Sequence, residues 1–223
     1  MRITVLVDNE PGPGLRADWG LSVYVDSGSW RALFDAGGDP AVLEHNAARL
    51  GVDLRSLDFA VVSHHHLDHV GGFMGRFLFK EGLTVFAPPG PTERLESAGL
   101  NVVVVESTRE IAPGAYAVGP LHARAVDEIA LALRAADGYA LLVGCSHPGA
   151  DALASRAASD LGGRIRLVAG GFHSPPRRVL DSLAGMADRI CPGHCSGDEA
   201  RSYLRSTYPD KYCEFRSGIT IEI

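Results

Sequence analysis

Short apolar runs alternate with polar turns along the chain, and their lengths predict a mixture of strands and helices. Runs of strand length predict strands at residues 1–7, 21–25, 30–34, 59–62, 83–86, 102–105, 129–133, 139–143 and 165–169, with one or two closing strands within 214–223. Helical spacing and end signals predict helices at residues 40–50, 92–98, 150–161, 177–186 and 198–208.

The ends of several elements are marked by characteristic residues. Turn-forming residues at 26–29 and at 134–138 each separate two adjacent strands, which predicts two hairpins. Asp39 and Pro40 suit the cap and the first position of a helix, and Gly51 suits its end. We find no repeat, low-complexity segment or domain boundary, so we expect one domain over residues 1–223. Strands broken by helices in both halves are typical of a layered α/β or α+β protein.

Composition and charge narrow the class of protein. Hydrophobic residues make up 46% of the 223 positions and charged residues 22%, as in ordinary globular proteins. The formal net charge of -6 weighs against sequence-independent binding to a nucleic-acid backbone. We see neither a secretion leader nor an apolar stretch of about 18 residues, the length that suggests a membrane span. We therefore expect a cytoplasmic protein with no nucleic-acid or membrane partner.

The four cysteines form no regular framework. In a cytoplasmic chain we expect them to be reduced. They are Cys145, Cys191, Cys195 and Cys213.

A cluster of histidines follows the predicted strand at 59–62. Residues 63–72 read SHHHLDHVGG, so four of the nine histidines and one aspartate fall within six consecutive positions. Histidine is the commonest metal ligand among side chains, and burying several unpaired imidazoles with a carboxylate is costly. The cluster therefore predicts a metal site. In an extended loop, His64 and His66 would face one ion, and Asp68 and His69 would reach round to a second. His65 would then point elsewhere.

Three further histidines follow apolar runs that end in glycine-containing turns. They are His147 in GCSH, His173 in AGGFH and His194 in CPGH. If the three runs are neighbouring strands, their ends converge on one edge of a sheet. We expect His147 and His194, ahead of His173, to complete the set of metal ligands.

Cys145 and Asp35 each have two open interpretations. Cys145 competes with His147 as a ligand because a thiolate also binds zinc, and its alternative role is that of a small buried hydrophobic residue. Asp35 in LFDAGG ends an apolar strand, where a carboxylate either orients a ligating imidazole or caps a turn. We do not expect a separate zinc knuckle in CPGHC, because no second pair of ligands matches it.

The HxHxDH motif at residues 64–69, with Asp35 at an earlier strand end, resembles the metallo-β-lactamase fold superfamily. Within it, the chain is similar to the subfamily of dihydropterin ribofuranosylaminobenzene phosphate synthases over about residues 8–203. The similar segments are GLRADWGLSVYV, LFDAGG, EHNAARLGVDL, SHHHLDHVGGF, GCSHPG, AGGFHS and PGHCSG.

The resemblance implies an αββα sandwich with two divalent transition-metal ions at one edge, zinc first and manganese or iron as alternatives. The usual bridging aspartate has no evident match, and Cys145, His147 or His173 stands in its neighbourhood. The implied metal ligands are His64, His66, Asp68, His69, His147 and His194.

The resemblance also suggests residues that contact substrate. It places the segments of Asn9, Asp18 and Trp19 near the pocket, where either substrate contact or local loop packing explains them. The tetrapeptide ADWG departs from the Glu-His-Gly expected there in the subfamily.

Together these expectations predict a metal-dependent hydrolase, or a related lyase or synthase. A metal-bound hydroxide, oriented by Asp68 as the catalytic residue, would attack a small phosphorylated or cyclic metabolite, with a pterin-related compound as one candidate. One alternative is a metal-containing ligand-binding or regulatory protein without turnover, and another is a phosphodiesterase acting on nucleic acid. The expected partner is a small molecule, and a homo-oligomer is left open.

Overall fold

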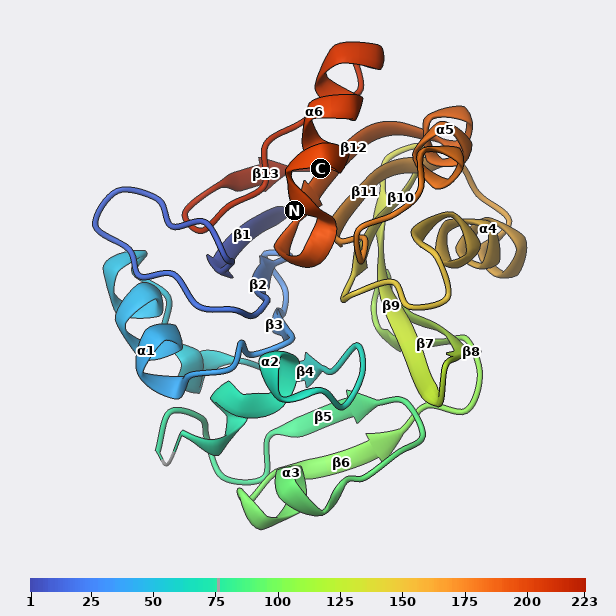
Figure 1. Ribbon diagram of the computed structural model, residues 1–223. Helices are drawn as coiled ribbons and strands as arrows, with labels where there is room; N and C mark the ends of the chain where they lie inside the picture. Colours follow the sequence, from blue (N-terminus) through green and yellow to red (C-terminus); the bar gives the residue numbers. More distant parts are fainter. Residues whose placement is uncertain (76) are drawn as a thin grey trace. The chain divides into compact units, whose positions relative to one another are not determined.

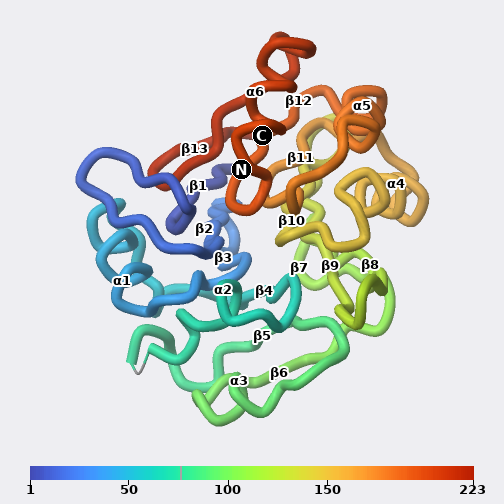
Figure 2. The backbone as a smooth tube through the Cα atoms, in the orientation of Figure 1, coloured from blue at the N-terminus to red at the C-terminus, as the bar shows by residue number. Residues whose placement is uncertain are grey.

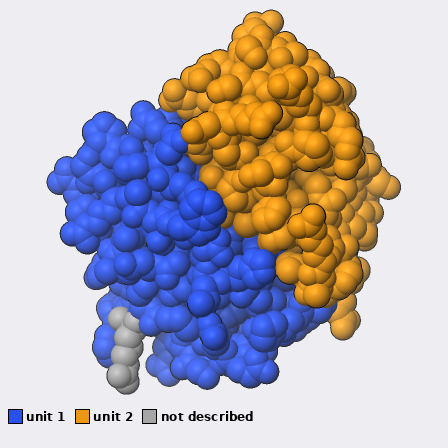
Figure 3. All heavy atoms as spheres, viewed as in Figure 1, with its two compact units in different colours: residues 1–105, 216–223 blue, residues 106–215 orange. Residues whose placement is uncertain are grey.

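The computed structural model describes residues 1–75 and 77–223 and divides the chain into two compact units. The first unit comprises Met1–Val105 with Arg216–Ile223, and the second comprises Glu106–Phe215 (Figure 3). Each unit contains its own sheet and its own buried core. The expectation of one domain stays a prediction.

The first unit contains a seven-stranded mixed sheet. Its strands are β1 (Arg2–Val7), β2 (Ser22–Asp26), β3 (Arg31–Phe34), β4 (Phe59–Val61), β5 (Thr84–Ala87), β6 (Asn101–Val104) and β13 (Thr220–Glu222). They follow the order β13-β1-β2-β3-β4-β5-β6 (Figure 1), antiparallel from β13 to β3 and parallel from β3 to β6. Both chain ends lie beside this sheet (Figure 2), where the Met1 ammonium donates to the Ile223 carbonyl at 3.0 Å.

The described part of the first unit contains the two predicted helices and three further short helical segments. They are α1 (Pro40–Arg49), the 3₁₀ turn η1 (Leu54–Ser56), α2 (Leu67–Val70), the 3₁₀ turn η2 (Gly71–Met74) and α3 (Glu93–Ser97). The Asp39 carboxylate caps α1 by accepting the backbone N–H of Ala41 at 2.8 Å. Leu43 and Ala47 on the inner face of α1 join the buried core of the unit. Of the three segments that were not predicted, α2 carries part of the histidine cluster.

The second unit contains a six-stranded mixed sheet. Its strands are β7 (Arg109–Ala112), β8 (Ala115–Ala123), β9 (Val126–Ala135), β10 (Gly138–Val143), β11 (Ile165–Gly171) and β12 (Ala187–Gly193). They follow the order β12-β11-β10-β9-β8-β7, antiparallel from β7 to β10 and parallel from β10 to β12. The carboxyl ends of β10, β11 and β12 therefore meet at one edge of the sheet.

Helices connect the parallel strands of the second unit. They are α4 (Ala150–Leu161), α5 (Arg177–Met186), the 3₁₀ turn η3 (His194–Ser196) and α6 (Gly197–Thr207). Helix α4 joins β10 to β11, and α5 joins β11 to β12, which is the crossover that parallel strands require. Leu153 of α4 and Leu183 of α5 are fully buried in the core of this unit. Of the helices in the described part of the chain, none combines the length and the apolar character needed to cross a membrane.

The sheet of the second unit extends further than the sequence pattern predicts. Strands β7 and β8 were not predicted, and in β8 Gly119 and Pro120 interrupt the alternating pattern. The pairing of β8 with β9 nevertheless continues through an irregularity between Val118 and Leu121. The closing segment of the chain contributes one strand, β13.

The expectation of four reduced cysteines is wrong for one pair. Cys191 of β12 and Cys213 form a disulfide, with their Cα atoms 4.7 Å apart. The two residues are 22 positions apart in the sequence and meet because Tyr212 pairs with Ile190 of β12. The spacing of the cysteines does not reveal this contact. Cys145 and Cys195 are not part of a disulfide.

Candidate metal centre

A fully buried carboxylate organises the histidine cluster of the first unit. Asp35 follows β3, and one of its oxygens accepts the backbone N–H of Ser63 at 2.7 Å. The other oxygen accepts the Ser63 hydroxyl at 2.7 Å and lies 2.7 Å from Nδ1 of His69. Because a carboxylate only accepts hydrogen bonds, Nδ1 of His69 is the protonated nitrogen of that ring, and Nε2 is left for a metal. Asp35 therefore contacts both the turn at Ser63 and the ring of His69, and the role of that ring as a metal ligand stays a prediction.

His64 and His66 present nitrogens at the spacing of two ligands to one ion. Nε2 of His64 lies 3.1 Å from Nδ1 of His66, and the Ser63 hydroxyl lies 2.9 Å from Nδ1 of His64. Two nitrogens bound tetrahedrally at about 2.0–2.1 Å from one zinc ion lie about 3.3 Å apart. The pair therefore fits a metal ion, as alternation along an extended segment predicts.

Asp68 and His69 lie on a helix and not in the extended loop that we expected. The short helix α2 begins at Leu67, so the two side chains are successive residues of a helical turn. Oδ2 of Asp68 lies 3.6 Å from Nε2 of His69. The helix forms because His69 and Val70 both donate their backbone N–H groups to the carbonyl of His66. The prediction that these two residues bind a second ion stays a prediction.

Two glycines after the motif allow the helix to pack against the end of β3. A Cβ atom on Gly72 would lie 2.0 Å from the carbonyl oxygen of Ala36, and one on Gly71 would lie 2.2 Å from that of Gly38. The Ala36 N–H in turn donates to the His69 carbonyl at 2.8 Å. The Gly-Gly pair thus sets the position of His69 relative to Asp35.

The fourth histidine of the motif has a structural contact. A ring nitrogen of His65 lies 2.9 Å from the carbonyl oxygen of Pro88, and the ring packs against Gly90. The expectation that His65 points elsewhere is confirmed.

In the second unit, the predicted ligands gather at the carboxyl ends of three parallel strands. Ligand atoms of Cys145, His147 and His173 lie within 4.8 Å of one another, and those of Cys145 and His194 do as well. Cys145 and His194 are buried, whereas His173 is exposed with its ring centroid 4.7 Å from that of His147. The expected convergence of these strand ends is confirmed. Cys145 is the residue common to both groups.

Glu128 of β9 is a site residue that the sequence pattern did not identify. Its side chain is fully buried, and one oxygen accepts the backbone N–H groups of Cys145 at 2.9 Å and Ser146 at 2.7 Å. The other oxygen accepts the N–H of His147 at 2.8 Å and lies 2.9 Å from its Nδ1. The sequence did contain a signal for Glu128, because this residue directly precedes the apolar run 129–133. A carboxylate that is buried with such a strand needs hydrogen-bond partners.

Several residues at these strand ends have backbone angles that side chains rarely adopt. Asp35, Ser146, His173 and His194 have φ values of 57°, 60°, 50° and 46°. Such conformations cost free energy and are typical of positions where the surroundings fix the backbone.

Asp18 and Asn9, which are proposed to contact substrate, have local structural contacts. Oδ2 of Asp18 accepts the N–H groups of Gly38 and Asp39, each at 2.8 Å, and Oδ1 of Asn9 accepts the N–H of Gly20 at 3.4 Å. Their role in the loop is therefore observed, and their contact with substrate stays a prediction. Trp19 is 66% exposed.

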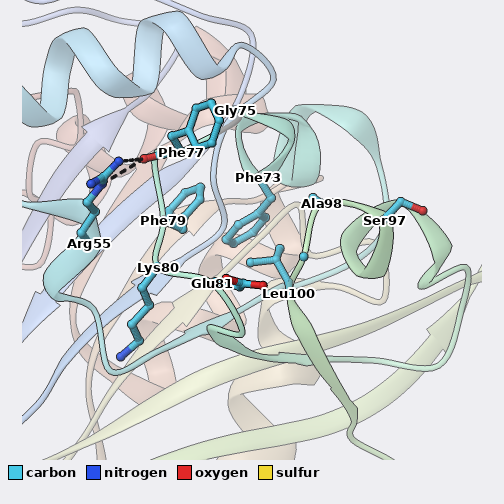
Figure 4. Close-up of a pocket in the computed structure, with 11 residues that line it drawn as sticks. Arg55, Phe73, Gly75, Phe77, Phe79, Lys80, Glu81, Ser97, Ala98 and Leu100 are labelled. Carbon is cyan, nitrogen blue, oxygen red and sulfur yellow. Dashed lines mark hydrogen bonds between the residues drawn. The ribbon is translucent and has the colours of Figure 1, made fainter.

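A pocket of about 540 Å³ in the first unit has no histidine among the described residues that line it (Figure 4). Phe73, Phe77 and Phe79 line it with residues 80–81 and 97–100, which precede β5 and β6. It is thus near the amino ends of these parallel strands, whereas the histidine motif follows the carboxyl end of β4. The pocket contains none of the predicted site residues.

Comparisons with known proteins agree with this geometry. A family model described as the metallo-beta-lactamase superfamily matches residues 20–194. The chain is 23% identical to the 7,8-dihydropterin-6-methyl-4-(beta-D-ribofuranosyl)-aminobenzene-5'-phosphate synthase of Methanocaldococcus jannaschii, over 86% of this chain and 84% of that protein.

Solved structures match over nearly the whole chain. Tm1679, a metal-dependent hydrolase of the beta-lactamase superfamily, has a TM-score of 0.85 and 25% identity and covers 100% of this chain and 99% of its own. The metallo-beta-lactamase fold protein YhfI from Bacillus subtilis has a TM-score of 0.70 and 14% identity, with 99% of each chain covered. These matches confirm the predicted α/β fold class. With the family model spanning most of its length and its HxHxDH motif in place, the chain belongs to the metallo-β-lactamase superfamily.

Proposed function

We propose that this protein is a metal-dependent hydrolase that acts on a small phosphorylated or cyclic metabolite. The observation that carries this proposal is the 3.1 Å spacing between Nε2 of His64 and Nδ1 of His66, which fits two ligands of one ion. Buried carboxylates that orient His69 and His147 add to it, because ligating histidines usually donate their second ring nitrogen to such a group.

The proposed ligands offer several kinds of donor atom. Imidazole, thiolate and carboxylate form a donor set that suits zinc, with manganese or iron as alternatives. Asp35 and Glu128 orient ligands, and Cys145 and His173 are further donors. The proposed ligands of two divalent ions are His64, His66, Asp68, His69, His147 and His194.

Asp68 is the proposed catalytic residue. Its side chain is 22% exposed, while that of His69 is completely buried, so Asp68 is accessible to water and substrate. Divalent ions bound here would lower the pKa of water and polarise the oxygen of the substrate that gains charge. The Asp68 carboxylate would orient the attacking water and accept its proton.

The proposed class of substrate comes from the relatives. The curated relative is a synthase of a phosphorylated pterin compound, and the relative with the highest TM-score given above is a metal-dependent hydrolase. At these identities the relatives support a small phosphorylated or cyclic compound, and a pterin-related one is the first to test.

Metal content tests the proposed ligands directly. Protein loaded with zinc and desalted would be analysed by mass spectrometry for the wild type, His64→Ala and His147→Ala. We expect about two equivalents in the wild type and less in each variant. His122→Ala is the matched control, because that ring is exposed beside Asp127, and we expect it to keep the wild-type content. Background metal in the wild type would refute the proposal.

Turnover distinguishes an enzyme from a binding protein. The zinc-loaded protein would be assayed on phosphorylated pterins, a model phosphodiester and a lactone, alongside Asp68→Asn. We expect turnover of one class by the wild type and a loss of about 100-fold or more in the variant. Full metal content without turnover of any of them, or unchanged turnover in Asp68→Asn, would contradict the proposed hydrolase.

A further inference from the structure

The outer edge of β12 is covered by a short segment of the same unit. Residues 211–215, here called the 211–215 segment, follow α6 and pair with the strand through two backbone hydrogen bonds. Ile190 donates to the Lys211 carbonyl at 2.8 Å, and Cys213 donates to the Ile190 carbonyl at 3.0 Å. The Cys191–Cys213 disulfide joins the segment to the strand covalently. Nζ of Lys211 also donates to the carbonyl of Ala187 in β12 at 2.9 Å, so hydrogen bonds and one covalent bond together hold this edge.

The 211–215 segment also packs next to a proposed metal ligand. A Cβ atom on Gly193 would lie 2.0 Å from Cδ1 of Phe215, so the ring lies directly on the glycine backbone. Phe215 is 3% exposed. The next residue is His194, which has a ligand atom within 4.8 Å of one from Cys145. The position of His194 therefore depends on contacts that the disulfide keeps in place.

We propose that the Cys191–Cys213 disulfide is a reversible redox link that controls metal retention through His194. This proposal rests on the proposed function, because it requires His194 to be a metal ligand. In the oxidised protein the link fixes the 211–215 segment, and with it Phe215 and the backbone at Gly193. In the reduced protein only the hydrogen bonds and the packing of Phe215 remain, so the end of β12 is held less firmly.

The accessibility of the two sulfur atoms determines which of them a reductant attacks. Cys191 is fully buried and Cys213 is partly exposed, so a reductant reaches Sγ of Cys213. A thiolate of a dithiol attacks that sulfur, the S–S bond breaks, and Cys191 leaves as a thiolate and takes up a proton. The second thiol of the reductant then displaces Cys213 as a thiol and closes the disulfide of the reductant. Two electrons and two protons pass from the dithiol to the protein.

Thiol counting and zinc release test the link without any measurement of activity. Zinc-loaded wild type would be compared before and after treatment with dithiothreitol and anaerobic desalting, using a chromophoric chelator to follow the release of zinc. When the thiols are counted in denaturant with a chelator, the four cysteines and one disulfide predict two titratable thiols before reduction and four after it. We expect zinc release to be roughly ten-fold faster from the reduced protein. Changing the groups that support a metal ligand typically lowers metal affinity by about 10–100-fold, and we take the lower end of that range.

The double variant Cys191→Ser/Cys213→Ser is the matched control. It should release zinc at the rate of the reduced wild type and should not respond to dithiothreitol, with circular dichroism confirming that both proteins are folded. Four thiols in the untreated wild type, or equal release rates in its two redox states, would overturn the link. If neither state binds zinc, the proposed function itself fails, and normal binding with equal release rates refutes only the link.

Discussion

Glu128 holds His147 at two points, accepting its backbone N–H at 2.8 Å and lying 2.9 Å from its ring Nδ1. The same carboxylate accepts two further N–H groups of the strand-end turn. One buried side chain therefore fixes both the backbone of the turn and the direction in which the imidazole presents Nε2. This is the arrangement expected of a carboxylate that orients a metal-binding histidine through the ring nitrogen that does not bind the metal.

Replacing Glu128 by Gln should weaken both stability and zinc binding. The amide has one acceptor oxygen, so its NH₂ group would face donors that the second carboxylate oxygen now satisfies. We expect the free energy of unfolding to fall by about 1–3 kcal/mol and zinc affinity to fall by about 10–100-fold. Urea denaturation and zinc competition measure the two effects. Glu110→Gln is the control, because that exposed side chain accepts only the N–H of Gly114 among the described contacts. Equal behaviour of the two variants would exclude the positioning role.

Asp35→Asn should have a similar effect in the first unit. The carboxylate satisfies the N–H and hydroxyl of Ser63 and the ring of His69, all without access to water. An amide leaves one of these donors without an acceptor, and we expect a loss of about 1–3 kcal/mol in the free energy of unfolding. Asp58→Asn provides the comparison, since Asp58 accepts a single exposed N–H from Arg31, and should change stability by less than about 0.5 kcal/mol. Chemical denaturation of the apo proteins would show whether the difference exists without metal.

Local sequence signals predicted the elements of this fold better than its non-local contacts. Helix α1 begins at its Asp39 cap, and α4 and α5 have the predicted bounds, because caps and apolar spacing act within one helix. The HxHxDH motif located the histidine cluster for the same reason. Glu128 and the Cys191–Cys213 disulfide were missed, because each joins residues 17 to 22 positions apart that only the sheet brings together. The irregular β8 was missed because Gly119 and Pro120 interrupt its alternation.

Two glycines with opposite surroundings give predictions of opposite sign. Gly72→Ala places a methyl group 2.0 Å from the Ala36 carbonyl oxygen, so either the backbone at Ala36 or the turn η2 must move. We expect a loss of about 1–3 kcal/mol in stability from this overpacking and weaker zinc binding, because Ala36 also binds the backbone of His69. Gly185→Ala lies within α5 and meets nothing within 4 Å, so it should raise stability by about 0.5–1 kcal/mol. Thermal unfolding of both variants checks the two signs, and a stabilised Gly72→Ala would contradict the close approach.

The pH dependence of stability should include a contribution from Asp181. Hydrogen bonds from the hydroxyls of Tyr203 at 2.7 Å and Tyr208 at 2.8 Å lower the pKa of Asp181 below its ordinary value of 3.8. A carboxyl whose pKa is lower in the folded state stabilises the protein fully above the unfolded-state pKa. That stabilisation is lost as the pH falls through the folded-state pKa. Because Asp181 is exposed, the effect is small and should decrease with salt.

The double variant Tyr203→Phe/Tyr208→Phe removes both donors and should flatten this part of the profile. Urea denaturation between about pH 5 and about pH 3 would show a smaller decrease in stability for the variant than for the wild type. Tyr212→Phe is the control, because that ring lies against Arg205 in the same unit, and it should keep the wild-type slope. Identical slopes for all three proteins would mean that the two tyrosines do not stabilise the ionised form of Asp181.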